Sequence, residues 1–168
     1  MFDLIHTEKI DNTATSSIQI NNIFTDDYIN YEIILSNLST VSGESDISVQ
    51  VVDNTNTIDT SSNYYYTYNR QRSASAIAII NSITGTSIPL AQVADRPKVG
   101  TVYMSMYGPK SVNGTHITFH SAMSNATEFR GYRGKGFSKV NQSVTGLNFN
   151  FSTDLLYATI KVYGMVKA

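Results

Sequence analysis

Apolar and polar residues alternate along most of this chain. The segment SSIQINNIF (16–24) places Ile18 and Ile20 between polar neighbours, and DISVQVV (46–52) repeats the same spacing. A period of two residues is typical of a strand that is buried on one face. Further strands are predicted at 28–38, 63–69, 74–80, 100–108, 115–123, 143–151 and 155–165. No window of about 11 residues shows the apolar stripe of a helix, so the pattern predicts strands throughout.

Clusters of Gly, Asn, Asp and Ser separate these segments at intervals of roughly 8–12 residues, as in all-β sandwiches and barrels. We therefore expect an all-β chain: one antiparallel β-sandwich domain over residues 1–168, jelly-roll-like, with about 8–10 strands and the closing strand near the opening one. Residues 1–12 are expected to form an N-terminal arm or an edge strand. For SIPLAQVADRP (87–97), the alternatives are a short helical turn ended by Pro97 and a loop.

The composition agrees with this fold class and narrows the chemistry. Charged residues make up 15% of the chain, below the roughly one quarter of average soluble domains, and Ser, Thr and Asn together number 53. The absence of cysteine excludes disulfides, thiolate metal sites and a thiol nucleophile. The opening residues lack the basic and apolar regions of a signal peptide, and no stretch approaches the roughly 18 apolar residues of a membrane span. We therefore expect neither a leader nor a membrane partner.

Charge is distributed unevenly along the sequence. Residues 1–60 contain ten acidic side chains and one basic side chain, whereas residues 61–168 contain eleven basic and three acidic ones. The two parts carry −9 and +8, within a net charge of −1. Opposite charges of this size can pair within one subunit or between neighbouring copies.

The basic segment RGYRGKGFSK (130–139) is the candidate for a ligand-binding motif. It fails as a phosphate-binding loop, because its glycines lack the required spacing and no helix is predicted after it. Basic residues interleaved with Tyr and Phe can bind single-stranded nucleic acid. Four cations in a chain of net charge −1 give only a modest attraction, however, so nucleic acid is not an expected partner.

We expect the basic segment to make a protein interface instead. Arg130, Arg133, Lys135 and Lys139 are expected to face carboxylates of the acidic residues 1–60, from the same copy or a neighbouring one. The three glycines of the segment are expected to let the backbone of a hairpin or arm lie close against its neighbour. A solvated hairpin is the simpler alternative.

A run of tyrosines, NYYYTYN (63–69), gives a second candidate surface. On a strand, Tyr64, Tyr66 and Tyr68 share one face and Tyr65 lies on the other. Tyrosine buries apolar area while its hydroxyl stays hydrated, which suits subunit interfaces and saccharide platforms. We expect a subunit interface or the core, and a saccharide site as the alternative.

No arrangement of residues predicts catalysis. His116 and His120 lie four apart on a predicted strand, about 13 Å from one another, so they cannot bind one metal ion within a monomer. They are expected to be ordinary sheet histidines, although a three-fold axis would bring together one histidine from each subunit. The adjacent Asp26 and Asp27 point to opposite faces of a strand and cannot form the facing carboxylate pair of a glycosidase. We therefore expect no enzyme, no cofactor and no metal.

Three segments resemble the small β-sandwich virion proteins of tailed bacteriophages, particularly marine and cyanobacterial phages. TATSSIQINNIFTDDYINYEIILSNL (13–38) is similar to their opening, in which a Ser/Thr-rich strand, an Asp-Tyr turn and a Tyr-rich apolar strand follow one another. KVGTVYMSMYGP (98–109) resembles their Gly-Thr strand that ends in a small residue and Pro. LLYATIKVYGM (155–165) resembles their closing strand, with Ala158-Thr159 in place of the usual Gly-Thr.

The resemblance implies a jelly-roll-like, often trimeric subunit on the outside of a phage particle, without catalytic residues. The expected function is a non-enzymatic structural protein of the virion exterior, either a capsid decoration protein or a tail fibre or baseplate component. Its expected partners are two further copies of itself and other virion proteins. A carbohydrate-binding module that contacts host-surface glycans is the alternative, and a single-stranded nucleic-acid-binding β-protein is a further one.

Overall fold

The computed structural model describes residues 1–73, 75–93, 100–111, 113–124, 128–140 and 143–166. Every regular element in these ranges is a strand, which confirms the all-β prediction. The ten strands are β1 (Phe2–Ile20), β2 (Tyr28–Thr40), β3 (Ser45–Asp53), β4 (Tyr64–Arg72), β5 (Ser75–Gly85), β6 (Ile88–Val93), β7 (Gly100–Tyr107), β8 (Thr115–Ser124), β9 (Phe129–Ser138) and β10 (Val144–Val166). Within the described ranges, no helix is long and apolar enough to cross a membrane.

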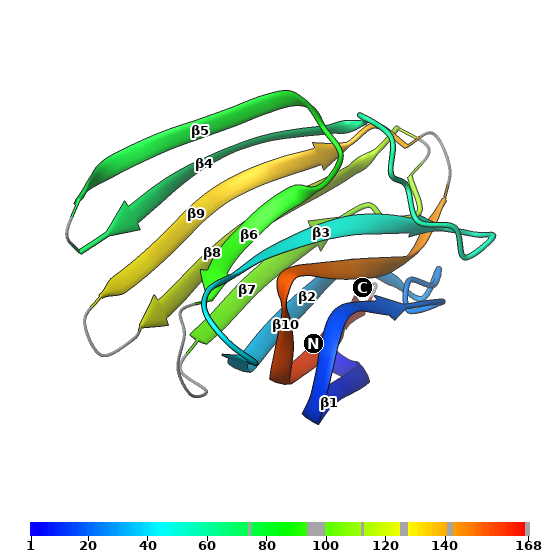
Figure 1. The fold of residues 1–168 in the computed structure, drawn as a ribbon. Coiled ribbons are helices and arrows are strands. Elements are labelled where there is room, and N and C mark those ends of the chain that lie inside the picture. Colours follow the sequence, from blue (N-terminus) through cyan, green and yellow to red (C-terminus); the bar gives the residue numbers. More distant parts are fainter. Residues whose placement is uncertain (74, 94–99, 112, 125–127, 141–142, 167–168) are drawn as a thin grey trace.

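The strands form one hydrogen-bonded antiparallel sheet that is folded into two layers (Figure 1). Its order is β5-β4-β9-β8-β7-β2-β10-β3-β6, and β1 pairs with β10. The later part of β10, residues 155–166, pairs with β2, whereas its earlier part, residues 144–151, pairs with β3. The sheet therefore turns from one layer into the other at a bend within β10 and β1. The large layer contains β5, β4, β9, β8, β7 and β2, and the small layer contains β3 and β6.

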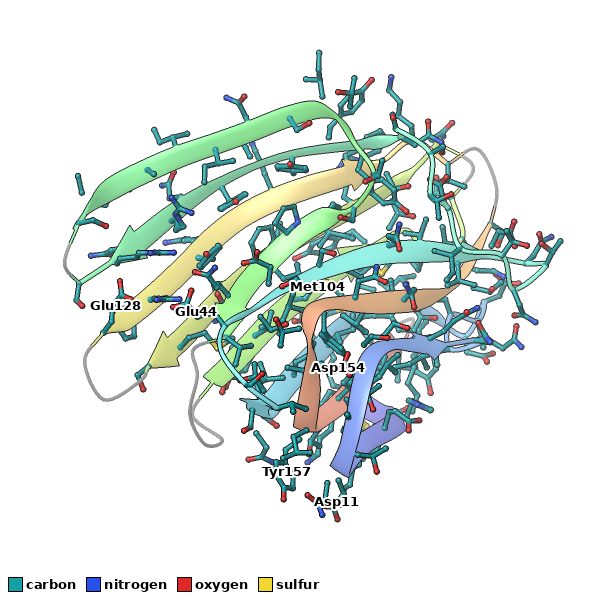
Figure 2. All side chains as sticks on the ribbon, viewed as in Figure 1. Asp11, Glu44, Met104, Glu128, Asp154 and Tyr157 are labelled. Atoms are coloured by element: carbon teal, nitrogen blue, oxygen red, sulfur yellow. The ribbon has the colours of Figure 1, made fainter. Side chains whose placement is uncertain are left out.

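The bend in the sheet has a local cause in β1. In β1, the pairing with β10 shifts register between Asp11 and Thr15, and Asn12 there has a φ of 54°. Extra unpaired residues of this kind bend and twist a strand. In Figure 2, Asp11 and its pairing partner Tyr157 lie at this bend. Two separate strands were predicted here, at 143–151 and 155–165, but the polar residues 152–154 that divide them are the corner of one continuous strand.

The two layers enclose a single apolar core. On β7, Val102, Met104 and Met106 are fully buried, while Tyr103 and Tyr107, which point to the opposite face, are about 40% exposed. Figure 2 shows Met104 between the layers. Side chains alternate between the two faces of a strand, so β7 gives one face to the core and the other to solvent. The same alternation on β8 and β9 gives the large layer an outer face that is free of other described elements.

β6 covers the inner faces of β8 and β9 from the other side of the core. Ile88 and Leu90 are fully buried there. Pro89 stands between them and is tolerated because β6 is the last strand of the small layer, where one side needs no ladder hydrogen bonds. The expected turn or loop at 87–97 is therefore wrong for residues 88–93, and residues 94–97 lie outside the described ranges.

Residues 1–12 lie in an edge strand, the second of the two alternatives predicted for them. Phe2 to Asp11 pair with the later part of β10, so the opening strand lies beside the closing one, as expected. The pairing also shifts register between Leu4 and His6.

Candidate functional site

The basic segment 130–139 lies in the middle of the large layer. All but its last residue belong to β9, which pairs with β4 on one side and β8 on the other. The segment is therefore one strand of the antiparallel β8–β9 pair inside the sheet, and the expectation of an arm is wrong. Glycine has a low intrinsic preference for strands, but strand preference depends strongly on packing context, and here both neighbouring strands fix the conformation.

Two of the glycines of β9 point into the sandwich: Gly136 lets the opposite layer approach closely, and Gly134 makes room for side chains of its own layer. A Cβ atom at Gly136 would lie 2.5 Å from Cδ1 of Ile88 on β6. A Cβ atom at Gly134 would clash with Tyr68 of β4 and lie 2.8 Å from Cζ of Phe119 on β8. The close approach expected of these glycines therefore occurs inside one chain.

Arg130 also points inward, at the open end of the sandwich where Figure 2 labels Glu44 and Glu128. Only 5% of its side chain is exposed. Its Nε donates to Glu128 at 2.7 Å, its Nη1 donates to Oε1 of Gln92 at 2.8 Å, and its Nη2 donates to Glu44. The same Gln92 oxygen accepts a bond of 2.6 Å from Arg72. The hydrogen bond from Arg130 lowers the pKa of the Glu44 carboxyl below its ordinary value.

The acidic part of the sequence thus provides a partner for Arg130 within the same chain. The ion pairs with Glu44 and Glu128 join the segment before β3 to the large layer. All three partners of the Arg130 guanidinium lie within the chain, so this side chain is not available to a ligand. Arg133 and Lys135, in contrast, are exposed on the outer face and form no ion pair with a described residue. The Nζ of Lys139 lies 4.2 Å from the centre of the Tyr65 ring, a cation–π contact.

The structure places the tyrosines of 63–69 on the two faces of β4, as the alternation predicts. Tyr64 and Tyr68 are buried and Tyr66 is half-buried against the core, so these three share the inner face as expected. The Tyr64 hydroxyl accepts a bond from the Val51 amide at 2.9 Å and donates to the Asp59 carbonyl at 3.0 Å. Burial raises the pKa of this hydroxyl above its ordinary value. None of the three presents an open ring to a saccharide.

The outer face of the large layer carries its side chains in rows that cross the strands. Antiparallel pairing places outward side chains of neighbouring strands directly opposite one another. The row that we call the Arg133 row consists of Asn69 (β4), Arg133 (β9), His120 (β8) and Tyr103 (β7). The row beside it, the Lys135 row, consists of Thr67, Lys135, Thr118 and Ser105 from the same four strands.

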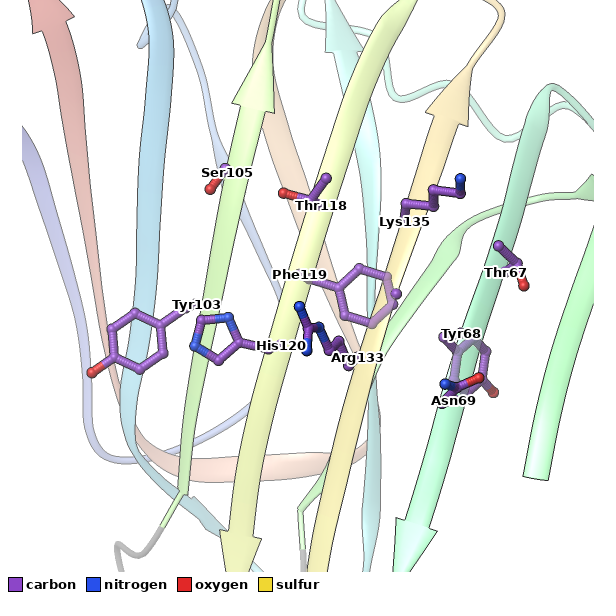
Figure 3. A pocket seen from close by; sticks show the side chains of 11 residues that line it. Thr67, Tyr68, Asn69, Tyr103, Ser105, Thr118, Phe119, His120, Arg133 and Lys135 are labelled. Atoms are coloured by element: carbon purple, nitrogen blue, oxygen red, sulfur yellow. The ribbon is translucent and has the colours of Figure 1, made fainter. Parts of the chain in front are cut away.

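A surface depression of about 550 Å³ lies between the Arg133 row and the Lys135 row, and we call it the central trough (Figure 3). Its floor consists of the inward-pointing residues Tyr68, Phe119 and Gly134. The rings of Tyr103 and His120 stack at 4.9 Å with 15° between their planes and form one wall. At the β7 end of the other wall, Ser105 donates a hydrogen bond of 2.8 Å to Glu32.

A second depression, of about 430 Å³, lies on the other side of the Lys135 row. It is bordered by stacked Tyr65 and Phe137, whose ring centres are 6.4 Å apart, and by His116, which contacts Phe137 at 4.8 Å. His116 and His120 thus stand in different rows, as the spacing along a strand predicts. No group of three or more His, Asp or Glu among the described residues is placed to hold a metal ion.

The free edge of the large layer is apolar. On β5, Ile77, Ile79 and Ile83 are 61%, 73% and 74% exposed. β5 pairs with β4 on one side and with no described strand on the other. Sequence inspection selected 74–80 as a strand but gave no sign of which strand would lie at the edge of the sheet.

Comparison with known proteins adds little to this picture. No family model matches the chain, and no curated protein matches it in sequence. Among solved structures, a complex of E230A-fructofuranosidase from Schwanniomyces occidentalis with fructosylnystose matches with a TM-score of 0.30 and 10% identity. That match covers 98% of this chain and 34% of the other one, so the chain spans about a third of that protein's length.

Proposed function

We propose that the protein is a non-enzymatic structural subunit that acts by assembly with further copies of itself through the open edge of β5. The observation that carries this proposal is the exposure of Ile77, Ile79 and Ile83 on β5, a strand that pairs with β4 on one side and with no described strand on the other. An edge strand offers free backbone donors and acceptors to another chain, and exposed isoleucines beside it add apolar surface that association removes from water.

The other two edges of the sheet support this choice. β6 carries Pro89 in its short edge, and β1 carries charged residues and repeated register shifts, and all of these features discourage pairing between chains. β5, with the sequence SAIAIINSITG, contains neither a charged residue nor proline. Its edge thus lacks these protective features.

The proposed setting is the exterior of a tailed-phage particle, and the proposed assembly is a homotrimer. Both rest on the sequence resemblance of 13–38, 98–109 and 155–165 to virion proteins. Closed symmetry suits the β5 edge, because the exposed isoleucines of three copies can meet around a three-fold axis, where the assembly closes and leaves none of them to seed fibres. A low content of charged residues agrees with a surface made for contact with other proteins.

Analytical ultracentrifugation of the wild type and of a triple variant, Ile77→Thr, Ile79→Thr and Ile83→Thr, tests assembly. Threonine keeps the strand preference of isoleucine while removing apolar surface. We expect a concentration-dependent trimer for the wild type and a monomer for the variant. A matched control replaces three exposed apolar residues outside β5, in the variant Leu4→Thr, Ile29→Thr and Val41→Thr, and should assemble like the wild type.

A wild type that stays monomeric at high concentration, or a β5 variant that assembles as tightly as the control, would contradict the proposed assembly. The proposed setting is tested separately. Mass spectrometry of purified phage particles from the source of this sequence should detect the chain, and antibodies to it should label intact particles. If the chain is absent from such particles, the virion role is refuted, but the result on assembly stays valid.

A further inference from the structure

We propose that the central trough binds an acidic saccharide, with Arg133 and Lys135 holding its carboxylate or sulfate group. This inference goes beyond assembly and uses a different part of the outer face. None of the three exposed isoleucines of β5 lines the central trough, although Ile79 lies opposite Asn69 at the β4 end of the trough. The trough and the proposed assembly surface are therefore adjacent but made of different residues.

The cations of the trough lack an anion. Arg133 and Lys135 stand two residues apart on the same face of β9, about 7 Å from one another along the strand. Neither forms an ion pair with a described residue. Glu32, the acidic residue that bonds Ser105, lies beyond the far end of the trough on β2. A ligand carboxylate between the two cations would receive charge-assisted hydrogen bonds from both.

The remaining lining residues match the rest of a sugar ring. Thr67, Thr118 and Ser105 present hydroxyl groups along the Lys135 row, and Asn69 presents an amide. The stacked rings of Tyr103 and His120 give the opposite wall an aromatic surface against the apolar face of a sugar. The trough crosses four strands, or about 14 Å between the axes of β4 and β7, and is therefore long enough for more than one ring.

Single-stranded nucleic acid fits the trough less well. Its affinity would depend on neutralising several phosphates, whereas the trough offers two permanently charged side chains. We therefore assign the trough to an acidic saccharide.

Isothermal titration calorimetry with three probes tests the assignment: an oligogalacturonate, an oligoalginate and a heparin oligosaccharide. We expect at least one to bind, and we expect Arg133→Gln or Lys135→Gln to weaken it at least tenfold, since each removes a charge-assisted contact. A methyl-esterified oligogalacturonate, which lacks the charge, is the ligand control. The control protein carries Lys110→Gln and Lys161→Gln, two cations outside the trough, and should bind within twofold of the wild type.

Any of the following results would overturn the proposal. The first is that none of the three acidic probes binds. The second is that an esterified probe binds as tightly as the acidic one, or that the control protein loses as much affinity as the trough variants. The third is that oligothymidylate binds more tightly than every saccharide, with an affinity that falls steeply with salt.

Discussion

Replacing Arg130 with alanine tests whether its buried guanidinium holds the two layers together. The group joins Glu128 beside β9, Gln92 of β6 and Glu44 before β3. Loss of one partner from a fully buried ion pair costs about 3–5 kcal/mol, but here the carboxylates that remain keep some contact with water, so we expect about 2–3 kcal/mol. One kcal/mol shifts the Tm of a chain of this size by about 2–4 °C, so we expect a decrease of about 4–12 °C in calorimetry.

The two carboxylates should contribute unequally to the free energy of unfolding that Arg130→Ala removes. The Glu128 side chain is 16% exposed, whereas that of Glu44 is 43% exposed and its attraction to Arg130 is screened by solvent. A pair screened in this way contributes about 0–1 kcal/mol. Double-mutant cycles with Glu128→Gln and Glu44→Gln in urea should therefore give the larger coupling energy for Arg130 with Glu128.

The pH dependence follows from the lowered pKa of Glu44. A carboxyl whose pKa is lower in the folded state stabilises the protein above its unfolded value and loses this effect as pH falls through the folded value. Wild-type stability should therefore decrease more steeply on acidification than that of the Glu44→Gln variant. Equal slopes would refute this step.

Arg133→Ala is the matched control on the same strand, because this side chain is exposed. We expect a change within about 0.5 kcal/mol for it. A decrease in Tm below about 2 °C for Arg130→Ala, or an equal decrease for both variants, would refute the assigned role of the cluster in joining the layers.

Three further predictions concern single positions. Tyr64→Phe leaves two backbone groups without their partner and should cost about 1–3 kcal/mol in urea unfolding, and no loss would contradict the bonding described. Gly136→Ala overpacks against Ile88 and should cost about 1–3 kcal/mol, whereas the outward Gly131→Ala should be tolerated. Hydrogen bonds, first of all from a threonine hydroxyl, lower the pKa of Asp53, so Asp53→Asn should reduce the loss of stability on acidification towards pH 3, measured by calorimetry.

The alternation of apolar residues was sufficient to predict the strands and the fold class, because each strand of a two-layer sandwich has one face in the core. It was insufficient for two elements. The polar residues 152–154 have the composition of a turn, yet β10 continues through them as one strand and changes its partner there from β3 to β2. In β6, the effect of Pro89 depends on its edge position, which the local sequence does not encode.

The candidate site could be predicted only in part, for a related reason. Charge singled out Arg130, Arg133 and Lys135, and the alternation along β9 explains why the first points inward and the other two outward. Tyr103 and Thr118 join the trough only through the register of β7, β8 and β9. Their outward positions were visible in the alternating patterns, but no local signal identifies which strands are neighbours.

The pairing of β1 with β10 has a consequence for the rate of folding. Ile18 contacts Phe149, and Phe2 contacts Met165, so native hydrogen bonds join residues separated by most of the sequence. The loop-closure entropy for such contacts is lost before their energy is gained, and domains of high contact order fold in milliseconds to seconds. Until β10 pairs with β1, β2 and β3, the fold is incomplete and the apolar inner faces of both layers remain exposed to water. A substitution that weakens the corner of β10 should therefore slow refolding and lower the yield of soluble protein, even where the final stability changes little.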